Sequence, residues 1–196
     1  GNNYKKAVKI DVIEAIYNYK PKPGTSTEMS KDIWLFLYLC YGMNMKDLCL
    51  LKFENIKGDY LEFIRAKTVR TKRKVEPIRV GLTEDIKAII EKYGNEDKNK
   101  TNYIFPILTS GLSKERERQL IQQFRRLVND QMINIAKKLG IDENLSSGVA
   151  RHSFATILRD SGEQESFVGD LMGHSDPKTT RNYFARREDK KVTERT

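Results

Sequence analysis

Apolar residues recur every three or four positions along most of this chain, which is the spacing of helices that bury one face. The pattern predicts helices over residues 5–19, 29–42, 45–51, 83–93, 113–139, 149–160, 164–172 and 176–183. Residues 33–41 are all apolar, so we expect the second helix to be buried on every side. Thr83 is placed to cap the fourth helix, and Asp176 followed by Pro177 to open the last.

Two short segments, residues 59–65 and 75–82, have the composition of paired strands. Pro77 predicts that the second strand lies at a sheet edge or starts late. The link between the segments is strongly basic, with seven Lys or Arg and one acid from residue 65 to residue 80. The chain is therefore predicted to be α+β and mostly helical, with one small antiparallel sheet.

Composition narrows the class of protein. The chain has 196 residues, the length of one good-sized domain, and a net charge of +9. Its longest apolar run has nine residues, half of what a membrane helix needs, and two cysteines are too few for a disulfide scaffold or a Cys-rich zinc site. The charge favours a polyanionic partner, although a solvated basic surface would explain it equally well. We expect a cytoplasmic protein.

Residues with catalytic chemistry converge in the last quarter of the chain. The only two histidines, His152 and His174, lie there, close in sequence to Arg151 and Tyr183. Residues 149–156 read Val-Ala-Arg-His-Ser-Phe-Ala-Thr, residues 171–175 read Leu-Met-Gly-His-Ser, and Tyr183 follows His174 by nine positions. These three blocks resemble the C-terminal signature of the tyrosine recombinases, or phage integrase family. Residues 37–52 resemble that family's first box, and the basic hairpin resembles its β2–β3 turn.

The resemblance covers nearly the whole chain and implies a catalytic domain over residues 1–185, followed by a charged tail over residues 186–196. We expect the family's separate N-terminal core-binding domain to be absent from these residues. The implied activity is metal-free, cofactor-free cleavage and rejoining of DNA through a 3′-phosphotyrosyl intermediate, as in the integrases of bacterial mobile elements. The implied partners are double-stranded attachment sites, with four protomers on DNA for the full-length protein and a monomer for this fragment.

Elementary chemistry assigns the same roles to the matching residues. Tyr183 would be the nucleophile, and Arg151 would hold two phosphate oxygens with its planar fork. His174 would donate to a non-bridging oxygen, and Lys67 would protonate the leaving 5′ oxygen, with Lys72 and Lys74 as rivals. His152 is expected to be a buried structural hydrogen bonder. The residues expected to bind DNA are Arg65, Arg70, Lys72, Arg73 and Lys74.

Two positions depart from the family pattern. Asn44 stands where the first box has an arginine, and Gly148 stands where the family has His or Lys, three residues before Arg151. Losing one positively charged donor at an oxyanion costs about 10² to 10³ in rate. We hypothesise that Arg65 or Arg70 supplies the missing charge.

These departures leave other interpretations open. A catalytically weakened relative that only binds DNA is the main alternative, and a type IB topoisomerase-like enzyme shares the nucleophile. Asp47 would either orient an active-site arginine or lie on a helix surface.

Overall fold

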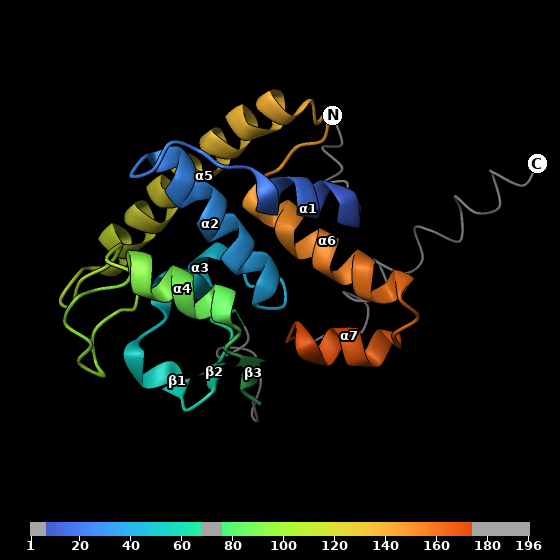
Figure 1. Cartoon of the computed structure of the whole chain (residues 1–196). Coiled ribbons are helices and arrows are strands. Elements are labelled where there is room, and N and C mark those ends of the chain that lie inside the picture. The colour runs from blue at the N-terminus through green and yellow to red at the C-terminus, as the bar shows by residue number, and fades with distance from the viewer. Residues whose placement is uncertain (1–6, 68–75, 174–196) are drawn as a thin grey trace, which may run out of the picture.

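The structure is a computed structural model that describes residues 7–67 and 76–173 (Figure 1). Its helices are α1 (Ile10–Asn18), α2 (Ser26–Leu39), α3 (Met45–Leu50), α4 (Glu84–Tyr93), α5 (Lys114–Leu139), α6 (Ser147–Asp160) and α7 (Glu165–Leu171), and its strands are β1 (Ile56–Lys57), β2 (Tyr60–Phe63) and β3 (Ile78–Gly81). A 3₁₀ turn, Phe53–Asn55, precedes β1. The predicted α+β class, mostly helical with one small antiparallel sheet, is confirmed. The predicted helix over 176–183 lies outside the described residues.

The ends of α2 differ from the prediction. The helix begins at Ser26, three residues early, because the Thr25 hydroxyl accepts a hydrogen bond from the Glu28 backbone N–H at 3.3 Å and caps it. It ends at Leu39 because Tyr41 and Gly42 adopt positive φ angles of 56° and 67°. Such a φ costs a tyrosine about 1–3 kcal/mol, and the Tyr41 ring stacks on Phe154 at 5.5 Å between centroids.

The middle of α2 forms the centre of the core, as predicted. Trp34, Phe36 and Leu37 are fully buried, and the helix packs against α4, α5 and α6 (Figure 1). The Trp34 indole N–H donates to the Ser146 carbonyl at 3.2 Å, so its one polar atom is satisfied. α2 is therefore the element around which the other helices are arranged.

The sheet has the order β1-β2-β3, and both pairings are antiparallel. Leu61 opposes Val80 and Phe63 opposes Ile78, which places these four side chains on the buried face. β3 is an edge strand and starts directly after Pro77, as the proline predicted. β1 was not predicted, because two residues are too few to show an alternating pattern.

α7 contacts both α6 and β3, so the end of α7 lies beside the sheet (Figure 1). This brings residues 171–173 close to the end of β2 and to the loop after α2. Within residues 7–67 and 76–173, no helix has the length and hydrophobicity needed to cross a membrane.

Candidate active site

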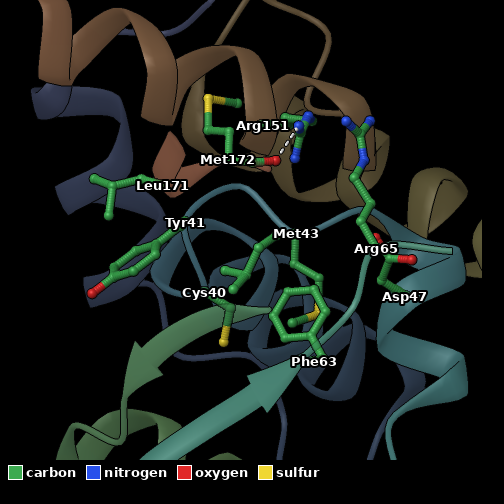
Figure 2. Close-up of a pocket in the computed structure, with 10 residues that line it drawn as sticks. Cys40, Tyr41, Met43, Asp47, Phe63, Arg65, Arg151, Leu171 and Met172 are labelled. Atoms are coloured by element: carbon green, nitrogen blue, oxygen red, sulfur yellow. Dashed lines mark hydrogen bonds between the residues drawn. The ribbon is translucent and has the colours of Figure 1, made fainter. Parts of the chain in front are cut away.

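A small pocket lies where the end of α2, the two longer strands, α6 and α7 meet (Figure 2). Its lining is largely apolar but includes three charged side chains, Asp47, Arg65 and Arg151. The remaining lining residues are Cys40, Tyr41, Met43, Phe63, Ile78, Leu171 and Met172. The pocket thus gathers one carboxylate and two guanidinium groups from three separate parts of the chain.

Arg151, on α6, joins two segments through backbone carbonyls. One terminal nitrogen, Nη1, donates to the Gly42 carbonyl at 2.6 Å, and Nη2 donates to the Met172 carbonyl at 2.9 Å (Figure 2). Hydrogen bonds from a charged donor are stronger than neutral ones. The guanidinium group is therefore held at a defined place, between the loop after α2 and the end of α7.

Gly42 permits this close approach. A Cβ atom at this position would lie 2.9 Å from the Cα of Arg151, closer than real Cβ contacts come, and φ is +67°. Only glycine combines that backbone conformation with the missing side chain. The Gly that closes the helix within the family-like first box is thus explained by packing against the backbone of Arg151.

The side-chain amide of Asn44 is directed towards α3. Its side-chain oxygen accepts from the Asp47 backbone N–H at 3.0 Å and caps the helix, while its nitrogen donates to the Asp47 carboxylate. Both ends of the amide are thereby engaged by one residue. The position where the first box has an arginine is occupied here by a neutral helix cap.

Asp47 is buried, so the interpretation that it lies on a helix surface is wrong. Its carboxylate also accepts from the Ala66 backbone N–H at 2.8 Å, which ties α3 to the end of β2. Burial raises the pKa of Asp47 above its usual value, and the Ala66 N–H and the charges of Arg65 and Arg151 act against this rise. The charge of this carboxylate is therefore balanced by one backbone N–H and by two nearby arginines.

Arg65 follows β2 by two residues and reaches the same segment as Arg151. Its Nη1 donates to the Gly173 carbonyl at 3.4 Å, one residue beyond the carbonyl that Arg151 holds. Figure 2 shows the two guanidinium groups beside each other, while Asp47 lies near the backbone end of the Arg65 side chain. Two positive charges therefore lie against the residues that immediately precede His174 in the sequence.

The other predicted site residues are placed less centrally or fall outside the description. Lys67 is exposed and comes two residues after Arg65, and Gly148 is half-buried in the first turn of α6. His152 is half-buried, less enclosed than predicted, because α6 presents that side of the helix nearer to solvent. The residues outside the described ranges are Tyr183, His174, Arg70, Lys72, Arg73 and Lys74.

Sequence reasoning missed the backbone partners of the two arginines. The carbonyls of Gly42, Met172 and Gly173 carry no side-chain signal, so composition and spacing do not reveal them. The one available signal was the glycine that ends the helix within the first box, which marks a sharp turn but does not say what approaches it.

The amino-acid sequence matches a known protein family and several known proteins. Residues 6–190 match the phage integrase family. Tyrosine recombinase XerD of Halalkalibacterium halodurans is 26% identical over 180 residues, which cover 91% of this chain and 56% of that protein. Tyrosine recombinase XerA of Pyrococcus horikoshii is 28% identical over 175 residues, covering 83% of this chain and 56% of that protein. The chain thus spans a little over half the length of these relatives.

Solved structures of recombinases have the same fold. The crystal structure of XerA recombinase matches 90% of this chain and 59% of its own, with a TM-score of 0.59 and 19% identity. The XerH site-specific recombinase, bound to its palindromic difH substrate, matches 98% of this chain and 54% of its own, with a TM-score of 0.62 and 14% identity. Fold and sequence agree, and the chain belongs to the phage integrase family.

Proposed function

We propose that this chain is the strand-cleaving and strand-joining part of a tyrosine-type site-specific DNA recombinase. The observation that carries the proposal is the pair of guanidinium groups, Arg65 and Arg151, held on consecutive carbonyls directly before His174. A phosphodiester shares one negative charge between its two non-bridging oxygens, and paired arginines are the side chains best suited to hold them. The family match and the DNA-bound recombinases of the same fold support the same conclusion.

The proposed reaction needs no energy source beyond the DNA. The phenolate of Tyr183 attacks the scissile phosphorus, a bond forms between that oxygen and phosphorus, and the bond to the 5′ oxygen breaks. Lys67 gives its proton to the departing 5′ oxygen, while Arg151 and His174 stabilise the negative charge of the transition state. A second 5′ hydroxyl then attacks the phosphotyrosyl bond and releases Tyr183, so one phosphodiester replaces another.

The proposed substrate is double-stranded DNA at an attachment site. The Tn1549 transposon integrase, solved in complex with circular intermediate DNA, matches 97% of this chain with a TM-score of 0.59. For the longer protein to which this domain would belong, we propose four protomers on two duplexes. A mobile genetic element fits this activity, and we expect the isolated chain to be monomeric.

One observation favours a second candidate function. Asn44 places a neutral helix cap where the first box would carry an arginine. A relative with weakened catalysis, which binds DNA without cutting it, would tolerate that substitution.

Covalent trapping separates the two candidates. We would incubate the chain with nicked duplexes of randomised sequence, in which cleavage releases a short fragment that diffuses away. The proposal predicts a covalent protein–DNA adduct on a denaturing gel, joined through a 3′ phosphate, and Tyr183→Phe should abolish it. Duplex binding without any adduct would favour the binding function, and the absence of both would contradict both candidates.

A further inference from the structure

We infer that Arg65 is a catalytic residue that supplies the second guanidinium group on the scissile phosphate, in place of the arginine absent at position 44. This inference rests on the function proposed above and adds to it the source of one positive charge. It concerns a residue that follows a strand, whereas position 44 lies in the loop between α2 and α3.

Asn44 cannot supply a positive charge to the scissile phosphate. Its amide oxygen and nitrogen are both engaged with Asp47, and the side chain is neutral. An amide also lacks the planar five-donor fork that matches a phosphate. The charge must therefore come from another part of the chain.

The backbone next to Arg65, at Ala66, is bonded to the same carboxylate as Asn44. The Asp47 carboxylate accepts from the Asn44 side chain and from the Ala66 backbone N–H at 2.8 Å. This one buried group therefore fixes the end of β2 against the beginning of α3. The side chain of Arg65, next to Ala66, starts beside the loop from which a first-box arginine would extend.

The guanidinium group of Arg65 lies beside that of Arg151. Both side chains line the pocket of Figure 2, both charges act on Asp47, and their guanidinium groups donate to the consecutive carbonyls of Met172 and Gly173. Among the described residues that line the pocket, they are the only cations. One phosphate can therefore be reached by both.

The two arginines differ in the length of their hydrogen bonds to the backbone. Arg65 donates to Gly173 at 3.4 Å, a long hydrogen bond, whereas Arg151 donates at 2.6 and 2.9 Å. Long hydrogen bonds are weak, and a charged phosphate oxygen is a stronger acceptor than a carbonyl. A phosphate oxygen would therefore be a stronger acceptor for Arg65 than the Gly173 carbonyl is.

Arg79 provides a matched control. It lies on the outer face of the same hairpin, pairs with Glu62 at 3.3 Å and sits over the Tyr60 ring. It carries the same charge close to Arg65 in the fold but does not line the pocket. Replacing Arg79 therefore removes one positive charge from the hairpin without touching the pocket.

The experiment measures the first-order rate of adduct formation for wild type, Arg65→Ala, Arg65→Lys and Arg79→Ala. Each variant is tested on the nicked duplex selected by wild type, with either a phosphate or a neutral methylphosphonate at the cleaved position. On phosphate, Arg65→Ala should form the adduct about 10² to 10³ times more slowly than wild type. The rate of Arg65→Lys should lie between these two, and the rate of Arg79→Ala should stay within about threefold of wild type. On methylphosphonate, which carries one negative charge less, the loss for Arg65→Ala should shrink to about tenfold or less.

A wild-type rate for Arg65→Ala on phosphate would overturn the inference. An equal loss on both substrates would also overturn it, because that result assigns Arg65 a purely structural role. If Arg65→Ala fails to fold by circular dichroism, the same comparison is made with Arg65→Lys, whose loss should also shrink on methylphosphonate. The absence of an adduct with wild type would instead contradict the proposed function itself.

Discussion

Two hollows flank α2, and they are built in opposite ways. One lies at the end of the helix and contains Asp47, Arg65 and Arg151. The other, of about 490 Å³, lies along its first half and is lined by Met29, Ile33, Tyr93, Phe105, Pro106, Ile107, Leu120, Gln123, Phe124 and Leu127. The first depends on backbone carbonyls, a glycine and a buried carboxylate. The second depends on apolar side chains at helical spacing.

This difference determines what each hollow tolerates. Apolar side chains exchange for others of similar volume at modest cost, because dispersion and burial have no fixed direction. Carbonyls and charges must meet their partners at defined angles and distances, and an unmatched buried polar group costs about 1–3 kcal/mol. The charged pocket should therefore respond sharply to small changes, and the apolar hollow should respond weakly.

Gly42→Ala should have the largest effect. The new methyl group would meet the Arg151 backbone at 2.9 Å, and alanine disfavours the φ of +67° at this position. The strain of a left-handed backbone costs about 1–2 kcal/mol and overpacking about 1–3 kcal/mol. Together they should lower the free energy of unfolding by about 3 kcal/mol. Urea unfolding measures the change in free energy.

Gly140→Ala is the matched control for that variant. Gly140 has nearly the same φ, +66°, but nothing lies within 4 Å of a Cβ atom there. Its loss should be about 1–2 kcal/mol, from left-handed strain alone. Equal losses for the two variants would show that the contact with Arg151 has no energetic weight.

Asp47→Asn should change how stability depends on pH. Burial raises the pKa of Asp47 in the folded chain above its unfolded value of about 3.9, so the folded state binds the proton more readily. This contribution to stability is fully present below the unfolded pKa and is lost as pH rises through the folded pKa. Wild type should therefore gain stability relative to Asp47→Asn when pH falls from 7 towards 4.

Urea unfolding of both proteins across that range tests this expectation, because the other titrating groups are shared and cancel. A constant difference between the two curves would contradict it. A difference that grows in the opposite direction would mean that the two arginines outweigh burial at Asp47.

Leu127→Ala, in the apolar hollow, should have the smallest effect. Leu127 is 38% exposed, so truncation removes a side chain that is only partly buried, and we expect a loss of about 1 kcal/mol or less. Val128, the next residue on α5, is fully buried. Val128→Ala should cost about 2 kcal/mol by the same urea measurement, from lost burial and the cavity left behind. A larger loss at Leu127 than at Val128 would contradict the proposed tolerance of the hollow.

The helices that form the apolar core were predictable from the sequence. The run at residues 33–41 predicted a buried helix, and Trp34, Phe36 and Leu37 are indeed fully buried. Helical spacing also predicted α4, α5 and α6 to within two residues at each end. These predictions succeed because burial of a helix face leaves a periodic trace in the residue types themselves.

The arrangement of the charged pocket was only partly predictable from the sequence. Asp47 remained ambiguous because a six-residue helix is too short for periodicity to show which side is buried, and its burial depends on the distant Ala66 N–H. The hypothesis that Arg65 or Arg70 supplies the missing charge named Arg65 but gave no means of choosing between them. Arg65 lines the pocket, whereas Arg70 lies outside the described residues.

The central position of α2 has a consequence for synthesis on the ribosome. Trp34 is hydrogen-bonded to Ser146, which lies 112 positions later in the chain. Gly42 is hydrogen-bonded to Arg151, which lies 109 positions later. At a translation rate of about 5–20 residues per second, these partners emerge roughly 5 to 20 s after α2. During that interval α1, α4 and then α5 can already pack against α2, but the face that α6 covers stays open. That face of the most apolar helix is therefore exposed to aggregation until α6 has been synthesised.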